Sequence, residues 1–496
     1  MDGVAEWTEV GAEQGLDHLA MLSPVETHYQ SLLRGFSSVT TRLRNYSFYA
    51  FWIAHYKRNV RNDSRQVFED QTRRVEALYA LASAQRPAET GVAGSTFAVE
   101  KLQADGEVID FRVETDYSTP QVERYLAPRG GAFPGIYYGQ MAEMGLVGRG
   151  KHHGLPVPNE ACNALAEAYE AALGGFTGDF LRLAEKGQVT RAELAPMVAM
   201  APSSLDQESK EAAILRDLLL GEDGADLSIN RRATLHAILE IAAKVRGEVE
   251  GGAAGEKVTE EMLKWRFLET APEGASATIH RSWQHYQVGD MVRLIYENLL
   301  NHSILALEDA DEGLTAPELI AELVKEVPEI SFEAWLTSLA DCQGSLRELQ
   351  ARGMVRACAS LSDILAPLAR LWCNWRHRLN ELKESYKEAP GQQTCFTELL
   401  WIAARLEEPA GTVIGQLLFH RVLRRHLEVA ARKFRLQSSY NYLIEVEDSR
   451  LHARGKVNVN SSGPRLATAL RFLEDVDLME KGCIAPRGLA YLGAKS

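Results

Sequence analysis

Long stretches without proline or glycine limit this chain to a mostly helical fold. Neither residue occurs in 39–84, and aromatic and aliphatic residues recur there at three- and four-residue spacing, the period of a helix with one buried face. The same period returns in 159–173, 205–220, 231–245 and 279–307. Since such helices bury their apolar faces against one another, the sequence predicts a mainly α, multi-domain helical protein.

A block near the N-terminus admits two interpretations. From Arg42 to Arg61, basic and aromatic residues are interleaved, as they are on surfaces that bind single strands. Six aromatic residues fall between Tyr46 and Tyr56, which is too many for one exposed face. We therefore interpret most of them as core residues.

Other segments break the helical pattern. Gly91–Ser95 and Arg129–Gly131 bracket a loop-rich region whose centre, Glu107–Glu114, alternates well enough for one strand. Gly247–Glu256 is small, flexible and acidic, which is typical of a linker. The expected organisation is a helical region at 1–87, a loop-rich insert with a short strand at 88–156, a helical region at 157–250, a second helical domain at 251–410, and a long basic helix followed by an α+β module at 411–496.

Helix starts can be placed from capping residues. Leu22–Thr27 predicts a helix that begins with Ser23 as N-cap and Pro24 at the first helical position. Thr315–Glu318 has the pattern of a capping box with proline.

The C-terminal segment has its own character. Tyr442–Glu447 and Leu451–Val459 are rich in β-forming residues, and Asp448–Arg450 between them favours a hairpin turn. Ser461–Pro464 then offers caps and a first-turn proline for a helix that starts near Leu466.

Charge is distributed unevenly along the chain. The net charge is −14 overall, but residues 411–496 hold 14 basic against 8 acidic residues, whereas residues 1–410 hold 40 against 60. A net negative charge argues against wholesale nucleic-acid binding, and the basic tail is the exception. Helix 413–435 contributes most of this charge through Arg421, Arg424, Arg425, His426, Arg432, Lys433 and Arg435.

Motifs for chemistry are weak or incomplete. Gly145–His152 matches seven positions of a phosphate-binding loop, but His152 replaces the hydroxyl residue that holds magnesium, and Pro156 interrupts the helix that should follow. The pairs His280/His285 and His420/His426 lack the i, i+4 spacing of metal ligands on a helix. The sequence therefore predicts no catalytic residue, no metal site, no cofactor and no small-molecule substrate.

Nothing in the sequence indicates export or membrane insertion. The start, Met1–Trp7, is acidic and lacks the basic and apolar regions of a secretory signal. The longest strongly apolar run, Phe48–Ala54, is far shorter than the ~20 residues that a membrane span needs. The six cysteines are scattered, which indicates reduced thiols and a cytoplasmic protein.

A resemblance appears at the C-terminus. Gly463–Met479 followed by Ile484–Leu492 resembles a winged-helix module. In that family a helix ends in one apolar segment, and a turn leads to a second apolar segment. Asp477 and Ala485 depart from the residues that the family often has at these places. The resemblance implies a winged-helix-like α+β fold, and winged helices serve both as DNA binders and as protein contacts.

A second resemblance concerns biological context. Thr41–Trp52 and Asn230–Leu235 are similar to phrases in uncharacterised bacterial proteins encoded in genome-defence neighbourhoods. The resemblance implies a role against phages or plasmids, and it carries no functional residue.

Together these observations predict a non-catalytic component of a bacterial defence complex. Its acidic helical body is expected to bind a protein partner subunit, and its C-terminal region to contact duplex DNA, with no membrane association. The expected nucleic-acid contacts are Arg424, Arg425, Arg454, Lys456, Arg465 and Arg471. Two alternatives remain open: an interaction scaffold that binds no nucleic acid, and a nuclease or hydrolase whose carboxylate and histidine cluster comes from distant positions.

Overall fold

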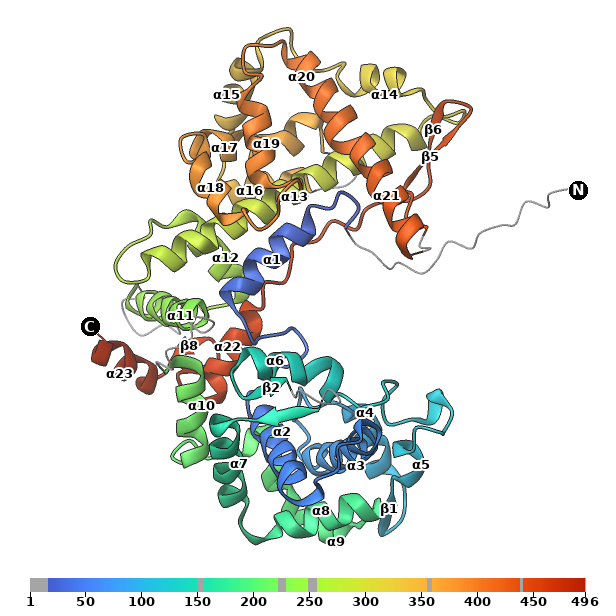
Figure 1. Ribbon diagram of the computed structural model, residues 1–496. Coiled ribbons are helices and arrows are strands. Elements are labelled where there is room, and N and C mark those ends of the chain that lie inside the picture. Colours follow the sequence, from blue (N-terminus) through green and yellow to red (C-terminus); the bar gives the residue numbers. More distant parts are fainter. Residues whose placement is uncertain are drawn as a thin grey trace, which may run out of the picture. The chain divides into compact units, whose positions relative to one another are not determined.

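The computed structural model describes residues 17–149, 155–221, 229–248, 257–354, 359–437 and 440–495 (Figure 1). They fall into two compact units, each assembled from segments that are distant in sequence. Unit 1 comprises Met1–Gln30, Phe267–Ala271 and Arg281–Ser462, and unit 2 comprises Ser31–Arg266, Pro272–His280 and Gly463–Ser496. Both are dominated by helices, which confirms the mainly α prediction.

Unit 2 combines many helices with three antiparallel two-stranded ladders. Its α-helices are α2 (Arg44–His55), α3 (Arg65–Ala84), α4 (Ser95–Gln103), α5 (Arg112–Thr115), α6 (Tyr138–Glu143), α7 (Glu160–Leu173), α8 (Thr177–Lys186), α9 (Arg191–Leu194), α10 (Lys210–Leu220), α11 (Ile229–Glu248), α22 (Leu466–Asp475) and α23 (Pro486–Lys495). Short π or 3-10 turns are η1 (Tyr56–Val60), η2 (Gln121–Glu123), η3 (Phe133–Tyr137), η4 (Gly174–Phe176), η5 (Ala195–Met200) and η6 (Pro202–Ser204). The ladders pair β1 (Val108–Asp110) with β4 (Gln188–Thr190), β2 (Val147–Arg149) with β3 (Pro156–Pro158), and β7 (Met479–Glu480) with β8 (Cys483–Ile484).

Helix α2 lies at the centre of unit 2. Its residues from Arg44 to Ala54 are buried, and the helix packs along α7. The ring of Phe48 stacks on Tyr79 of α3 at 3.8 Å between centroids, and Arg44 forms a buried ion pair with Glu211 of α10 at 2.9 Å. These contacts confirm that the aromatic block near the N-terminus is core.

The strand expected over Glu107–Glu114 is shorter than predicted. β1 ends at Asp110 because the Oδ1 of Asp110 accepts the backbone N–H of Arg112 at 3.0 Å, and this local bond turns the chain into α5. Alternation continues in the sequence beyond this point, but the aspartate ends the strand.

Unit 1 is helical apart from one hairpin. Its elements are α14 (Ala316–Leu323), α15 (Phe332–Ala340), α16 (Leu346–Gly353), α17 (Leu361–Trp375), α18 (Leu379–Ser385), α19 (Cys395–Ala403), α20 (Ala410–Gln416), the π-helical η8 (Leu417–Leu423), α21 (Arg424–Gln437), β5 (Ile444–Glu447) and β6 (Arg450–Ala453). Helices α1 (Leu22–Leu32), α12 (Glu260–Glu269) and α13 (Ala277–Glu308) begin in one unit and end in the other.

Two predicted helix starts have different outcomes. The capping box at the start of α14 is confirmed, since Thr315 and Glu318 each accept the other's backbone N–H. The prediction that Ser23 caps α1 is wrong. The carboxylate of Asp17 accepts the N–H groups of Met21 and Ser23 at 2.8 and 3.1 Å, so the cap comes from outside the local pattern.

The predicted hairpin and the helix after it are present as β5–β6 and α22, but the second strand ends at Ala453 and is shorter than the predicted Leu451–Val459. Asp448 and Ser449 form the two-residue turn with φ of 48° and 68°, the conformation that matches the twist of the flanking strands. The hairpin lies in unit 1, whereas α22 and α23 lie in unit 2.

Three sequence features lie outside the described residues. These are the start of the chain at 1–16, which includes Met1–Trp7, most of the expected linker at 249–256, and positions 150–152 of the phosphate-loop-like segment. The five segment boundaries stay predictions. Among the described helices, none has an apolar stretch long enough to cross a lipid bilayer.

Candidate nucleic-acid interface

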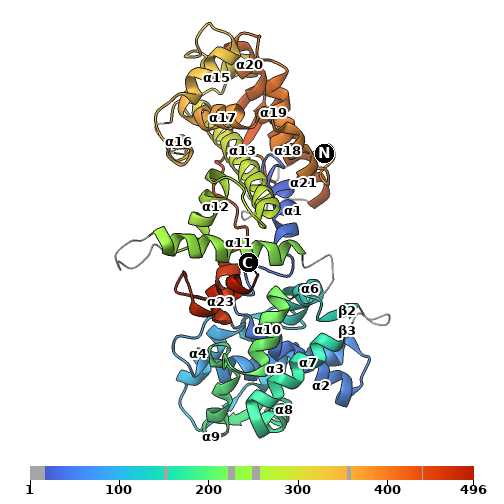
Figure 2. The same cartoon turned by 90° about the vertical axis from the view of Figure 1, so that its left-hand side faces the viewer.

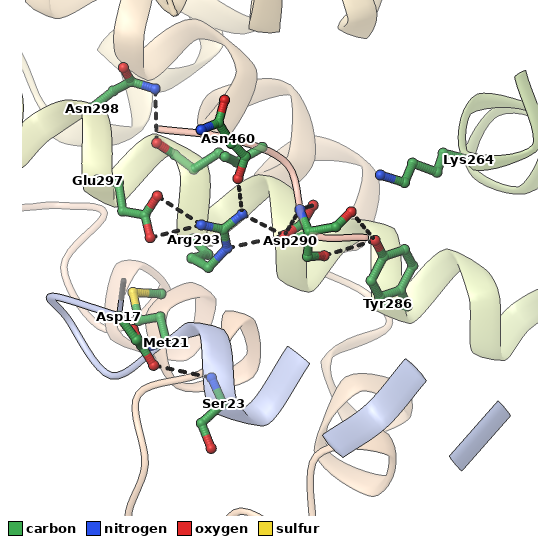
Figure 3. A network of polar contacts seen from close by, with 12 residues as sticks. Asp17, Met21, Ser23, Lys264, Tyr286, Asp290, Arg293, Glu297, Asn298 and Asn460 are labelled. Atoms are coloured by element: carbon green, nitrogen blue, oxygen red, sulfur yellow. Dashed lines mark hydrogen bonds and ion pairs between the residues drawn. The ribbon is translucent and has the colours of Figure 1, made fainter. Parts of the chain in front are cut away.

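A row of polar residues follows one face of α13 in unit 1, and Figure 3 shows its members from Tyr286 to Glu297. The spacing along the helix is three, four or seven residues, which places the row on a single face. Its members are Tyr286, Asp290, Arg293, Glu297, Asn301 and Glu308.

Arg293 is the centre of this row and is almost fully buried. Its guanidinium donates to Asp290 at 2.8 and 3.0 Å and to both carboxylate oxygens of Glu297 at 2.8 Å. It also donates to the carbonyl of Asn460 at 2.6 Å. Burial raises the pKa of Glu297 to about 7, and the charge of Arg293 opposes that rise. A buried charge that is paired and hydrogen-bonded in this way fixes geometry.

The same face of α13 holds the extended segment 456–462. Asn301 both donates to and accepts from the backbone of Val457, at 2.9 and 2.8 Å. Asp290 accepts the N–H of Ser462 at 3.0 Å, and the Tyr286 hydroxyl lies 2.9 Å from the Ser462 hydroxyl. Side chains of the polar row on α13 therefore provide hydrogen-bond partners for the backbone of segment 456–462, which pairs with no strand among the described residues.

Two of the predicted nucleic-acid contacts, Lys456 and Arg454, form ion pairs within unit 1. Lys456 Nζ lies 2.5 Å from the Glu308 carboxylate at the end of the α13 row. Arg454, just after β6, is paired with Glu445 of β5. Each cation is thus neutralised by a carboxylate of its own unit, which weakens its attraction for a phosphate.

Of the two predicted contacts in unit 2, Arg465 immediately precedes α22 and Arg471 lies within it. Arg465 precedes the helix with a left-handed φ of 66° and is half-buried, and Arg471 is exposed. Across α22 only Ala467 and Arg471 are exposed. Figures 1 and 2 show α11 beside α22 and α23, and these helices are in contact.

The opposite side of α22 is covered by residues 36–43. Phe36 packs edge-on against Phe472 at 4.8 Å, and the Thr468 hydroxyl donates to the carbonyl of Ser37 at 2.8 Å. Asp475 accepts the N–H of Leu43 at 2.7 Å. A helix that reads a DNA groove needs a free polar face, and on α22 that face is reduced to one arginine.

Helix α21 in unit 1 carries the other two predicted contacts. Arg424 is exposed and paired with Glu428 at 2.9 Å. Arg425 is half-buried and donates to the carbonyl of Leu19 at 3.0 Å. Burial first, and then the positive charge of Arg432, lowers the pKa of Arg425.

Further along α21 lie two arginines of the predicted basic helix that are not among the six predicted contacts. Arg432 and Arg435 are exposed. Within the described residues neither forms an ion pair, and Arg435 donates only to the carbonyl of Ala431 in its own helix. The signal was available in the spacing, because positions 425, 432 and 435 differ by seven and three residues and so share one face.

We call Arg424, Arg425, Arg432 and Arg435 the α21 basic face. From Arg425 to Arg435 it spans about 15 Å of helix, the length of roughly four base pairs. Glu428 is the one acidic residue in α21. Of the six predicted contacts, two lie on this face, two are paired with carboxylates in or near the hairpin, one precedes α22 and one lies within α22.

A histidine and carboxylate cluster that the sequence did not reveal joins α13 and α18. His285 Nδ1 lies 2.6 Å from Ser385 Oγ, and His285 Nε2 lies 3.5 Å from the Glu381 carboxylate. Ser385 and Glu381 are four residues apart and so share one face of α18. Burial, and then His28, lowers the pKa of His285 to about 4, so its imidazole is neutral near pH 7.

Residues 41–52 and 230–235 both contact residues 31–35 in unit 2. Tyr46 donates to the carbonyl of Gly35, Asn230 to Ser31 and Arg231 to Arg34. Both segments therefore hold residues 31–35 in place, which is a structural role.

Among the described residues, no group of three or more His, Cys, Asp or Glu side chains is placed to hold a metal ion. No protein-family model, curated protein or solved structure matches the chain.

Proposed function

We propose that this protein is a non-catalytic, DNA-contacting component of a bacterial defence complex, and that the α21 basic face is where it meets DNA phosphates. The observation that carries the proposal is the pair Arg432 and Arg435, two exposed guanidinium groups without an ion pair in the described chain. Phosphate contacts by such groups supply most of the affinity in binding that does not depend on sequence.

The defence context rests on the resemblance of Thr41–Trp52 and Asn230–Leu235 to defence-associated bacterial proteins. A partner subunit is favoured by charge, since residues 1–410 carry a net charge of −20 and repel nucleic acid. In this account the acidic surface binds a protein, and DNA contact is confined to the basic face.

A winged-helix-like arrangement belongs to the proposal as a structural element. Helix α22, the hairpin β7–β8 and helix α23 follow one another as in that family, and α11 packs on β8 and α23. The N–H of Val258 donates to the carbonyl of Gly482 in the hairpin turn at 2.8 Å. Because residues 36–43 cover α22, this module acts as a packing element and leaves DNA contact to α21.

DNA binding by the full-length protein tests the proposal. Fluorescence anisotropy with a duplex of about thirty base pairs compares the wild type with Arg432→Gln/Arg435→Gln. Removing two phosphate contacts is expected to weaken binding about tenfold or more at 50 mM salt.

The matched control is Arg454→Gln/Lys456→Gln. It removes the same two formal charges, but from side chains outside the α21 basic face that are already paired with Glu445 and Glu308. We expect this variant to bind within about threefold of the wild type. Equal losses in both variants, or no binding by the wild type, contradict the proposal, and the latter result favours an interaction scaffold.

A second candidate function, hydrolysis, is favoured by the cluster of Ser385, His285 and Glu381. Neutral His285 is placed to accept the Ser385 hydroxyl proton while Glu381 faces the other ring nitrogen, the order of roles in a nucleophile–base–carboxylate set. A fluorophosphonate probe tests it: the Ser385 oxygen bonds to phosphorus, fluoride leaves, and the proton passes to His285. Labelling that is lost in Ser385→Ala and kept in Ser338→Ala supports hydrolysis, and an unlabelled wild type rules out an activated Ser385.

A further inference from the structure

We infer that the DNA bound at the α21 basic face is single-stranded, with its bases stacked on aromatic rings at the end of α21. This inference rests on the proposed function and specifies the form of its ligand. It is carried by side chains that the phosphate argument does not use.

Three aromatic rings, one near the C-terminal end of α21 and two shortly after it in the sequence, form a continuous series. Phe434 lies 6.3 Å from Tyr440, with the ring planes at 87°, and Tyr440 lies 5.2 Å from Tyr442, with the planes at 46°. Phe434 is 47% exposed, and Tyr440 and Tyr442 are half-buried. Tyr440 thus contacts Phe434 edge-on and Tyr442 packs on Tyr440, while Phe434 keeps a large exposed area.

The exposed ring lies close to cations in the sequence. Phe434 follows Arg432 and Lys433 and precedes Arg435, and the nearby Leu436 is 77% exposed. In contrast, the rings of the other basic and aromatic block, in α2, are buried in the core. One turn of α21 therefore carries an exposed aromatic ring and two arginines that form no ion pair among the described residues.

The chemistry of this combination favours unpaired bases. In a duplex the bases are stacked on one another and their faces are closed to a protein ring, whereas a single strand presents the face of each base. Stacking on an aromatic side chain contributes about 1–3 kcal/mol per base, and neighbouring guanidinium groups hold the backbone. The α21 end supplies both groups within one helical turn.

Binding of two forms of one sequence tests the inference with the full-length protein. A labelled thirty-nucleotide single strand and its duplex are titrated at 100 mM salt. The single strand is expected to bind about tenfold more tightly than the duplex, and Phe434→Ala is expected to weaken single-strand binding by about fivefold or more without changing duplex binding.

Two further variants separate stacking from a general loss of structure. Phe434→Trp retains an aromatic face and is expected to keep single-strand binding within about twofold of the wild type. Leu400→Ala, which removes another exposed apolar side chain of unit 1, is expected to have no effect. Duplex binding as tight as single-strand binding, with Phe434→Ala unchanged, overturns this inference and leaves the proposed function standing. Absence of binding to both forms overturns both.

Discussion

The protonation state of His426 is set by its neighbours. Its side chain is fully buried; Nε2 accepts the N–H of Leu443 at 3.0 Å, and Nδ1 faces the carbonyl of His18 at 3.4 Å. One ring nitrogen must therefore be bare and the other protonated, which describes a neutral imidazole. Burial, and then the charge of His18, lowers the pKa of His426 from 6.5 to about 4.

This lowered pKa predicts a loss of stability in acid. Between pH 6.5 and about 4 the unfolded chain binds a proton at this histidine that the folded chain does not, so stability falls as the pH falls. At pH 5 the loss from His426 alone is about 2 kcal/mol relative to pH 7.5.

Urea unfolding at pH 7.5 and 5.0 measures this loss. His426→Gln keeps an acceptor for Leu443 but has no proton to gain, so the difference between the two pH values is expected to shrink by about 2 kcal/mol. The exposed His420→Gln serves as the control and should keep the wild-type difference. An unchanged difference in His426→Gln contradicts the assigned role of this histidine.

For single residues, the sequence could predict some ion-pair and hydrogen-bond partners but not others. Glu445 faces Arg454 across a hairpin that the β pattern predicted, so that ion pair was within reach of sequence reasoning. Lys456 pairs with Glu308, which lies far away in the chain. Histidines that pair through the fold, such as His285 with Ser385, leave no local signal for the same reason.

Among the helices, the position of α22 could be predicted from the local sequence, but its packing partners could not. Its apolar period and starting proline predicted its position, and α22 forms as expected. The pattern could not tell that residues 36–43 cover it, because those contacts join the two ends of the chain. Likewise the polar row on α13 was visible as spacing, but its partner segment 456–462 was not.

The contact between Asp475 and residues 42–43 is expected to hold α22 in unit 2. Asp475 accepts the N–H of Leu43 and the Nε of Arg42, and its side chain is 8% exposed. Asp475→Ala leaves the Leu43 N–H and the Arg42 Nε without this acceptor, while Arg42 keeps its ion pair with Glu89, so the free energy of unfolding in urea should fall by about 2 kcal/mol. Glu480→Ala on the exposed β7 position should cost less than about 0.5 kcal/mol. Equal effects of the two changes would show that the contact contributes little.

At the level of the whole molecule, the positions of the basic residues explain how a protein with a negative net charge can carry a local basic surface. The basic residues of 411–496 are divided between the two units, and several are neutralised by carboxylates of their own unit. Sequence composition indicated the excess of positive charge but not which cations stay unpaired. The structure leaves the α21 basic face as a local exception on an acidic protein.

The most direct test of this account is the salt dependence of DNA binding by the full-length protein, measured by anisotropy between 50 and 200 mM salt. Each phosphate contact adds about 0.9 to the slope of log affinity against log salt for duplex DNA. Arg432→Gln/Arg435→Gln should therefore reduce the slope by about 2, and Arg454→Gln/Lys456→Gln should leave it nearly unchanged. A wild-type slope near zero, or the same slope in both variants, would contradict the claim that the α21 basic face contacts DNA.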